Sequence, residues 1–345
     1  MTQPTNPLPD FMGNEHIIQT LRRALSAGRL PHAMLFTGPE GVGKRTLALR
    51  ISKALNCLKG GEEFCGECSS CRKIEAGSHP DVVWVTVEEG KQFLQIDQIR
   101  RAREDVFFQP FEGRYRIFIF DAAERMRSDA ANSILKMLEE PPPQTKLFLL
   151  TSNFHSLLPT IRSRCQIFSF SPLPLSIVRR ALDTRTEMST PDRDLCARLA
   201  QGSIGRALSL DLELHRTLRA EVFEFLRGAL TPRSAGTTLA LAESMGKDKE
   251  SFEDRLNILY GLIHDVFYLL HRGDPAFLTN IDLLADLTKL SARVDEAWVD
   301  KTVATLDVIR EGLRRSINRR MALEDLSFVM AEGALPEPSA TNRRS

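Results

Sequence analysis

The chain has 345 residues, enough for two or three domains, and its 46 Lys and Arg against 45 Asp and Glu give a formal net charge of +1. Such a balance excludes a global basic field, so any contact with nucleic acid must be local or shared with partners. Because the amino terminus is polar and no apolar stretch could span a bilayer, we expect a cytoplasmic protein that does not contact membrane.

Strands and helices alternate through the first half of the sequence. Apolar runs predict strands over residues 33–37, 82–87, 115–120, 146–151 and 166–170. Helical spacing predicts helices over residues 17–27, 44–58, 96–107, 128–140 and 157–162, the fourth capped by Ser128. This alternation favours an α/β domain over residues 1–170, with helices on both faces of a parallel sheet.

Helical patterns fill the second half of the sequence. Residues 171–211 predict a small helical domain, in which Thr190 and Pro191 open a helix as its N-cap and first helical residue. Residues 212–331 carry apolar residues at three- and four-residue intervals, which predicts an all-α domain. The last residues, 332–345, contain Pro, Ser and Arg, and we expect them to be disordered.

A glycine-rich segment joins the first predicted strand to the helix that follows it. Gly38, Gly41 and Gly43 have the spacing of a phosphate-binding loop, and Lys44 is the lysine of that motif. The next position normally supplies a Ser or Thr hydroxyl to Mg²⁺, whereas Arg45 has five donors and no acceptor. The loop therefore predicts at most weak binding of ATP or ADP, with Arg45 near the phosphates as a poor substitute for Mg²⁺.

A second departure lies at the strand over residues 115–120. This strand ends in Asp121, as a metal-positioning strand should, but Ala122 stands where many such ATPases place a catalytic Glu. Glu124 is the next carboxylate, and we expect it to face away from the site. Asn153 ends another strand, where it could orient a water or a phosphate, or simply bond the local backbone. The whole predicts no hydrolysis of ATP.

Four of the six cysteines form one cluster, Cys57, Cys65, Cys68 and Cys71, with the spacing C-x7-C-x2-C-x2-C. In a cytosolic protein this spacing predicts a structural, tetrahedral Zn²⁺ site rather than disulfides, with reduced thiols as the alternative. A catalytic zinc is not expected, because no His or carboxylate pattern leaves an open coordination position.

Two sets of arginines could meet phosphate. Arg164 comes just before the last predicted strand of the first domain, where it could project from the rim toward a neighbouring protein; a solvated surface arginine is the alternative. A basic run lies on the last helical segment, where a solvated face is favoured over contact with DNA. Its members are Arg310, Arg314, Arg315, Arg319 and Arg320.

Several segments carry specific motifs in combination. They are residues 30–33 (LPHA), 36–39 (FTGP), 96–100 (IDQIR), 130–142 (AANSILKMLEEPP), 158–165 (LPTIRSRC) and 202–208 (GSIGRAL), together with the cysteine cluster. In this combination the sequence resembles the bacterial clamp-loader subunits of DNA polymerase III, an AAA+ family. The match is dense over the first domain and thinner in the last third of the chain.

The resemblance implies an AAA+ domain over residues 1–170, with the zinc knuckle inserted at 57–71, then a lid over 171–211 and an oligomerising collar over 212–331. It implies a five-subunit ring with tau/gamma ATPase subunits and a delta subunit, which loads the sliding clamp onto primer-template DNA. Arg45 and Ala122 depart from the ATPase branch and favour the delta-prime branch. In that branch Arg164 would act as an arginine finger at the adjacent subunit's ATP site, and Arg206 would face nucleotide.

Other functions remain open at this stage. One is an active tau/gamma-like ATPase, and another is a free-standing P-loop ATPase acting on nucleic acid. Both would need compensation for Arg45 and Ala122. A third is a zinc-knuckle adapter without a ring, which would not need Arg164 or Arg206.

Overall fold

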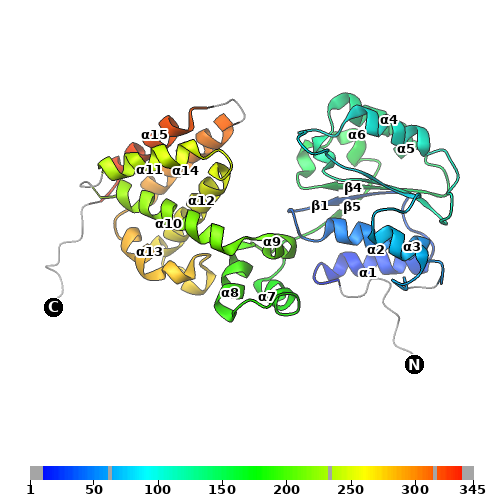
Figure 1. Ribbon diagram of the computed structural model, residues 1–345, viewed down its shortest axis with the longest axis horizontal. Helices are drawn as coiled ribbons and strands as arrows, with labels where there is room; N and C mark the ends of the chain where they lie inside the picture. Colours follow the sequence, from blue (N-terminus) through cyan, green and yellow to red (C-terminus); the bar gives the residue numbers. More distant parts are fainter. Residues whose placement is uncertain (1–10, 61–63, 232–234, 314–316, 336–345) are drawn as a thin grey trace. The chain divides into compact units, whose positions relative to one another are not determined.

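The computed structural model describes residues 11–60, 64–231, 235–313 and 317–335 (Figure 1). The chain divides into two compact units, the first made of residues 1–186 with 200–208 and the second of 187–199 with 209–345. Residues 1–10, at the start of the predicted first domain, and most of the predicted disordered tail lie outside the described residues. The division into three domains with a separate lid stays a prediction.

A five-stranded parallel sheet forms the centre of the first unit. Its strands run in the order β2-β3-β4-β1-β5, as the alternation of strands and helices predicted. The three middle strands are buried along their whole length, in keeping with the apolar residues that dominate their sequences. The strands are β1 (Ala33–Thr37), β2 (Val82–Val85), β3 (Arg116–Phe120), β4 (Thr145–Thr151) and β5 (Gln166–Ser169).

Helices cover both faces of this sheet (Figure 1). Three pack on one face in a core with Phe36 and Phe148, and they are α1 (Glu15–Ser26), α2 (Lys44–Asn56) and α3 (Ser69–Glu75). Three lie on the other face in a core with Leu35 and Phe118, and they are α4 (Ile96–Asp105), α5 (Ser128–Glu139) and α6 (Pro159–Arg162). Short 3₁₀ turns, η1 (Ala123–Arg125) and η2 (Phe154–Ser156), follow β3 and β4.

Two predicted helix caps are shifted by one residue. Ser128 is the first residue of α5 rather than its cap, because Arg127 occupies the N-cap position with extended backbone angles. Helix α8 (Thr190–Leu199) already includes Thr190, and the Ser189 hydroxyl accepts a hydrogen bond from the N–H of Asp192 at 3.3 Å. Ser189 therefore caps α8, because its hydroxyl reaches an amide that has no partner within the helix.

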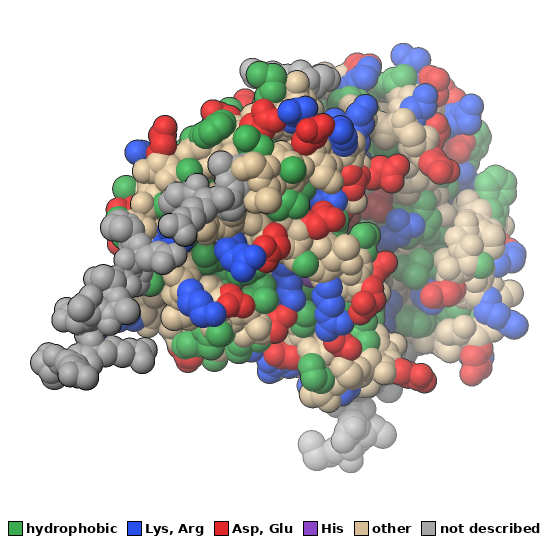
Figure 2. All heavy atoms as spheres, turned by 60° about the vertical axis from the view of Figure 1, so that its left-hand side comes forward, with side chains coloured by type: hydrophobic (Ala, Val, Ile, Leu, Met, Phe, Trp, Pro, Cys, Tyr) green, Lys and Arg blue, Asp and Glu red, His purple; other side chains and the backbone are tan. Residues whose placement is uncertain are grey.

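Helices alone make up the described part of the second unit. Together with α8 they are α10 (Leu212–Ala229), α11 (Ala235–Lys247), α12 (Phe252–Leu270), α13 (Leu284–Ser291), α14 (Glu296–Leu313) and α15 (Arg319–Glu332), with 3₁₀ turns η4 (Pro275–Phe277) and η5 (Ile281–Leu283). Their core holds Phe225, Leu259 and Trp298, and the Trp298 indole N–H donates to the carbonyl of Met330 at 2.8 Å. Basic and acidic side chains are interspersed over the face of this unit that Figure 2 shows.

The remaining helices, α7 (Leu175–Asp183) and most of α9 (Ile204–Ser209), group with the sheet. The backbone of Gly202, at φ 82°, turns between α8 and α9 and accepts a hydrogen bond from the N–H of Leu173 at 2.8 Å. A side chain at position 202 would collide with Leu173, since an added Cβ would come within 2.6 Å of its backbone nitrogen. Glycine at this position therefore permits the close contact of the turn with Leu173 that holds the start of α9 in the first unit.

Candidate nucleotide site, metal centre and rim arginine

The glycine-rich segment lies at the carboxyl edge of the sheet. It connects β1 to α2. The neighbouring strands β3, β4 and β1 run parallel, so the residues that follow their ends, Asp121, Asn153 and Gly38, all lie at one edge of the sheet. Gly38, Gly41 and Gly43 have φ angles of 139°, 73° and 107°, which L side chains rarely adopt. The local sequence thus folds into the turn that a phosphate-binding loop requires.

Lys44 is folded back onto the loop that it was predicted to serve. Its Nζ donates to the carbonyl oxygens of Gly38 at 2.5 Å and of Pro39 at 2.7 Å. Burial lowers the pKa of Lys44, and the nearby carboxylates of Glu124 and Asp121 only partly oppose this effect. The loop's own carbonyls therefore occupy donors that would otherwise be available to phosphate.

Arg45, which follows the loop lysine, forms an ion pair with Asp121 at the end of β3. Arg45 Nη1 lies 3.0 Å from Asp121 Oδ2, and the guanidinium carbon lies 4.5 Å from the centre of the Trp84 ring. The guanidinium thus lies against the carboxylate that would position a metal, and the expectation that Arg45 lies near the phosphates of a bound nucleotide stays a prediction. Trp84 lies on β2, beside β3 in the sheet. It was not identified from the sequence, because the order of the strands was unknown.

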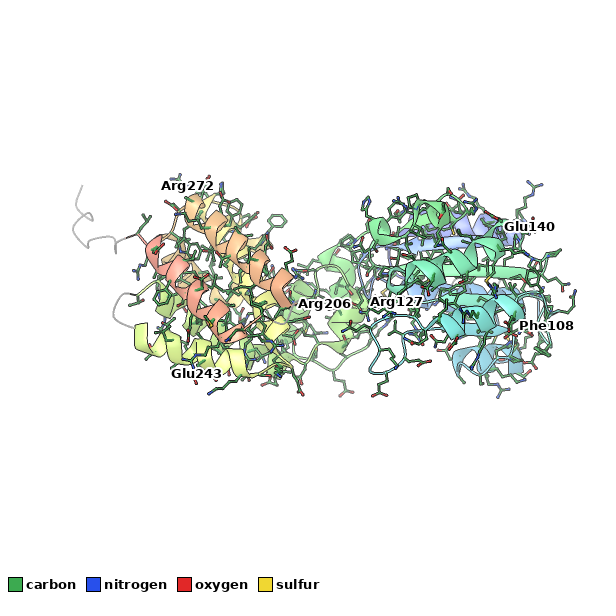
Figure 3. All side chains as sticks on the ribbon, turned by 90° about the horizontal axis from the view of Figure 1, so that it is seen from above. Phe108, Arg127, Glu140, Arg206, Glu243 and Arg272 are labelled. Carbon is green, nitrogen blue, oxygen red and sulfur yellow. The ribbon has the colours of Figure 1, made fainter. Side chains whose placement is uncertain are left out.

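Residues from the start of α9 press against the tip of the loop. The N–H of Gly205 donates to the carbonyl of Gly41 at 2.9 Å, and a Cβ added at Gly41 would lie 2.2 Å from Ser203 Oγ. Arg206 is exposed, and its backbone N–H donates to Ser203 Oγ at 3.0 Å (Figure 3). The structure thus places the backbone of Arg206 next to the loop and adds Ser203, which the sequence analysis quoted only as part of the 202–208 motif.

The expectation that Glu124 faces away from the site is wrong. Ala122 adopts a left-handed conformation, with φ 57°, and turns η1 so that Glu124 reaches the end of β4. There Glu124 Oε1 accepts hydrogen bonds from the backbone N–H of Ser152, at 3.1 Å, and from its hydroxyl. Burial tends to raise the pKa of Glu124, but the bonds from Ser152 outweigh it and lower the pKa.

Asn153 is used locally. Its Oδ1 accepts a hydrogen bond from the backbone N–H of His155 at 3.1 Å and caps η2. This is the local backbone role that the sequence left open as the alternative to orienting a water or phosphate. Asn153 is therefore near Asp121 at the sheet edge, but its side-chain oxygen is engaged with its own turn.

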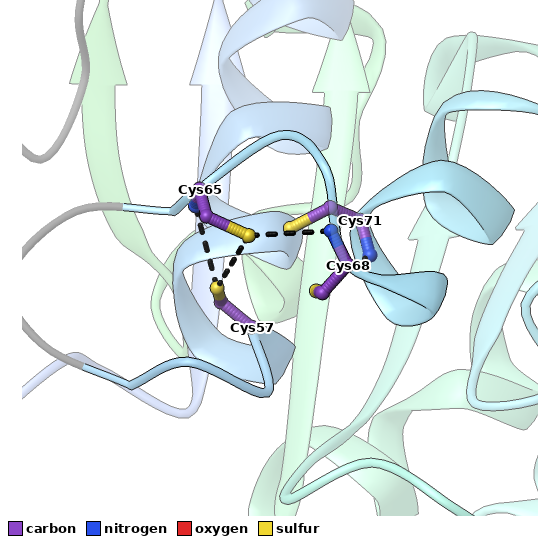
Figure 4. Close-up of side chains that lie close together, drawn as sticks. All are labelled: Cys57, Cys65, Cys68 and Cys71. Atoms are coloured by element: carbon purple, nitrogen blue, oxygen red, sulfur yellow. Dashed lines mark hydrogen bonds between the residues drawn. The ribbon is translucent and has the colours of Figure 1, made fainter.

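The cysteine cluster forms a compact group of four thiols (Figure 4). The Sγ atoms of Cys57, Cys65, Cys68 and Cys71 all lie within 4.8 Å of one another, so they could hold one metal ion. Cys57 and Cys65 Sγ are 3.6 Å apart, close to the ~3.8 Å edge of a tetrahedron with metal–sulfur bonds of about 2.3 Å.

Backbone amides point at these sulfurs. The N–H groups of Cys65, Cys68 and Cys71 donate to the Sγ atoms of Cys57, Cys65 and Cys68 at 3.3, 3.3 and 3.4 Å. Burial opposes ionisation of Cys68, but amide hydrogen bonds outweigh it and lower the pKa of this thiol to about 6. Burial raises the pKa of Cys71 to about 12. A bound cation would favour the thiolate of both. Helix α3, which Cys68 caps, was not predicted.

Arg164 lies at the opposite edge of the sheet from the glycine-rich loop. It precedes β5, and β5 runs parallel to β1, so Arg164 lies at the amino edge and the loop at the carboxyl edge. Strands of five residues separate the two edges by about 15 Å. Arg164 Nη1 donates to the carbonyl of Thr160 at 2.9 Å, and Nη2 lies 2.6 Å from Glu139 Oε1. Arg164 therefore does not belong to the site formed by Lys44 and Asp121.

The basic run of the last segment is only partly described. Arg314 and Arg315 lie outside the described residues. Arg310 and Arg319 lie over the rings of Tyr260 and Phe252, with guanidinium carbons 5.6 and 5.7 Å from the ring centres. Arg320 pairs with Glu243 and Glu324. These three arginines have partners within the chain, and the preference for a solvated face over contact with DNA stays a prediction.

Two family profiles match most of the chain. The profile described as DNA polymerase III, delta subunit, matches residues 13–174, and the one described as its C-terminal part matches residues 216–329. DNA polymerase III subunit delta' of Bacillus subtilis is 29% identical over 322 residues, which cover 92% of this chain and 96% of that protein. The chain belongs to the delta-subunit family of DNA polymerase III clamp loaders. The predicted resemblance is confirmed.

Other relatives of this clamp-loader subunit match it over a shorter stretch. DNA polymerase III subunit tau of Escherichia coli K12 is 34% identical over 207 residues, 58% of this chain and 32% of that protein. The chain thus spans about a third of the length of the tau subunits that it matches. A solved gamma subunit-related protein of Thermotoga maritima overlaps with a TM-score of 0.46 at 20% identity, over 91% of this chain and 98% of that one.

Among the described residues, no helix combines the length and the apolar character needed to cross a membrane.

Proposed function

We propose that this chain is a delta-prime-like member of the clamp-loader ring that does not itself hydrolyse ATP. The Arg45–Asp121 ion pair, at 3.0 Å, carries this proposal. A Mg²⁺ site needs a hydroxyl and a carboxylate at these positions, but here a guanidinium replaces the first and neutralises the second. Ala122 offers no base, and the Glu124 carboxylate at the same edge is engaged by the N–H and hydroxyl of Ser152. We therefore propose that this chain lacks both the metal ligand and the base that hydrolysis needs.

Binding of ATP or ADP is, at most, a residual property of this site. A nucleotide would have to draw Lys44 from the carbonyls of Gly38 and Pro39, and it would find Ser203 and Gly205 against the loop. Gly38, Gly41 and Gly43 still present the backbone turn, with Arg206 nearby, so weak binding without Mg²⁺ is compatible with the loop.

Zinc is proposed as a structural cofactor of the cysteine cluster. Four thiols close together, with amide donors on three of them, would fill the four positions of a tetrahedral zinc site and leave none open for substrate. When bound, Zn²⁺ would cross-link the end of α2 to the start of α3 and contribute directly to the folding of this segment.

Arg164 is proposed to act in trans. Its position at the amino edge of the sheet separates it from this chain's own loop, which supports a role at a site outside the chain. The adjacent tau/gamma ATPase subunit is the proposed beneficiary. A guanidinium suits this role because it is always charged and its planar fork matches phosphate oxygens. The other proposed partners are the delta subunit, the sliding clamp, and primer-template DNA through the assembled ring.

Reconstitution tests the proposal. The chain is mixed with tau/gamma and delta subunits of the same organism, and ATPase is measured with clamp and primed DNA. We expect co-elution, DNA-stimulated ATPase that depends on this chain, and no turnover by the chain alone. Turnover by the chain alone that Lys44→Ala abolishes would indicate an active ATPase. A chain that binds zinc but never joins the complex would instead be an adapter.

A further inference from the structure

We infer that Glu139 is a positioning residue for Arg164, an inference that rests on the proposed action of Arg164 in trans. Glu139 is the last residue of α5, and its Oε1 lies 2.6 Å from Arg164 Nη2. On the other side, Arg164 Nη1 donates to the carbonyl of Thr160 in α6 at 2.9 Å. The two Nη atoms thus have acceptors on two different helices, which fixes the plane of the guanidinium.

The Arg164–Glu139 ion pair orients the guanidinium more than it stabilises the fold. The side chains of Arg164 and Glu139 are 35% and 47% exposed, and ion pairs with this much solvent contribute little to folding. The Thr160 carbonyl belongs to a short helix that α5 packs against, and Ile161 of α6 is fully buried in the same core. The acceptors are therefore held by rigid elements even though the arginine tip is accessible.

The remaining donors of Arg164 suit an external phosphate. The bonds recorded among the described residues use Nη1 and Nη2 and leave the Nε–H without a partner. A long arginine side chain without contacts would sample many rotamers. Fixing one of them at the transition state would then cost conformational entropy. Two fixed acceptors remove most of that freedom beforehand, while the side chain stays 35% exposed to an approaching partner.

Substitution of Glu139 in the reconstituted complex tests this inference. We expect Glu139→Gln to lower the DNA-stimulated kcat roughly three- to tenfold, because a misplaced group loses rate steeply with distance. The KM for ATP should stay within about twofold, since the ground state is bound by the neighbour's own loop. Glu139→Asp keeps the charge and should recover part of the rate. The variant should assemble, hold zinc and melt like the parent chain.

A matched control lies one residue further on. Glu140 is exposed at the end of α5 (Figure 3), and among the described residues no ion pair is recorded for it. Glu140→Gln removes the same charge from the same end of the helix and should leave kcat unchanged. An equal loss in both variants would overturn the inference, because the effect would then be one of net charge.

A double variant separates the inference from the function on which it rests. In Glu139→Gln/Arg164→Ala, kcat should equal that of Arg164→Ala alone, because Glu139 acts only through the arginine. If Arg164→Ala lowers kcat and Glu139→Gln does not, or raises it, Glu139 does not position the arginine. If Arg164→Ala itself changes nothing, the action in trans is wrong and the inference falls with it.

Discussion

Arg45 Nη1 lies 3.0 Å from Asp121 Oδ2, so the residue after the loop lysine is paired with the carboxylate that should position a metal. The guanidinium also lies over Trp84, 4.5 Å from the ring centre. One substitution thereby changes two positions of the site: it removes the hydroxyl ligand and supplies a cation that neutralises Asp121. The same contact makes Trp84 a reporter of this site.

Arg45→Thr should partly reopen the site. The variant frees Asp121 and restores a hydroxyl, so we expect the affinity for Mg²⁺–ATP to rise roughly tenfold or more, about 1.4 kcal/mol. Hydrolysis should still be absent, because Ala122 provides no base. Trp84 fluorescence measures binding, and the other tryptophan, Trp298, lies buried in the second unit. A gain that survives added Lys44→Ala would show that the nucleotide binds elsewhere.

Cys68→Ser should release zinc and destabilise the segment between α2 and α3. The serine hydroxyl is a far weaker ligand than a thiolate, and a structural site contributes folding free energy directly. We expect about one zinc per parent chain, less than half of that in the variant, and a lower melting temperature. Cys165→Ser, outside the cluster, is the control and should keep its zinc. Parent protein with no metal and four titratable thiols would contradict the prediction.

Local patterns predicted the elements well where a single property decides them. The β1 strand and the start of α2 at Lys44 have their predicted bounds, because the apolar run and the glycine turn leave little choice. Helix α3 was missed because its seven residues are few, carry Cys71 of the cluster and show little apolar periodicity. The cap of α8 was shifted by one residue because Ser189 and Thr190 both suit that position.

Contacts within the candidate site depend on strand order, which the sequence does not contain. Arg45 and Asp121 were each identified from motifs. Trp84 was identified only from the structure, in which β2 lies beside β3. Glu124 was misplaced because the left-handed conformation of Ala122, with φ 57°, is uncommon for alanine and no local pattern indicates it. The partner of Arg164, Glu139, lies in a motif that was read only as a family signature.

Asp81 should make stability depend on pH. This fully buried carboxylate accepts hydrogen bonds from the N–H groups of Phe111, Glu112 and Gly113 at 2.7, 2.9 and 2.7 Å. Burial tends to raise the pKa of Asp81, but the three amides outweigh it and lower the pKa. Its contribution is therefore fully present above the unfolded pKa of about 3.9 and is lost as pH falls through the lower folded pKa.

Asp81→Asn separates this contribution from general acid unfolding. At neutral pH the variant should lose about 1–3 kcal/mol of unfolding free energy, because an amide oxygen cannot replace a carboxylate for three donors. Between about pH 5 and pH 2 the variant should lose less stability than the parent, since it has no carboxylate to protonate. Urea unfolding at several pH values measures both, with the exposed Asp97→Asn as control. Parallel pH profiles for parent and Asp81→Asn would contradict the assignment.

Arg164→Ala should lower the ATPase of the assembled complex without affecting this chain's own fold. The side chain is 35% exposed and pairs with Glu139, so its removal leaves no buried charge behind. Arginine fingers supplied in trans are worth about 10³–10⁵ in rate at the site that they serve, because they meet charge that develops in the transition state. The loss measured in DNA-stimulated ATPase and clamp loading should be partial if other sites in the ring still fire.

Arg164→Lys should be nearly as harmful as Arg164→Ala, because an ammonium keeps the charge but loses the planar fork that contacts two oxygens at once. Arg162, two residues earlier, is the matched control: its guanidinium carbon lies 4.8 Å from the centre of the Phe154 ring. Arg162→Ala should leave the ATPase of the complex unchanged. All variants are compared in complexes of verified stoichiometry and zinc content. An Arg164→Ala complex with parental ATPase would make Arg164 a solvated rim residue, and a full rescue by Lys would mean that charge alone is sensed.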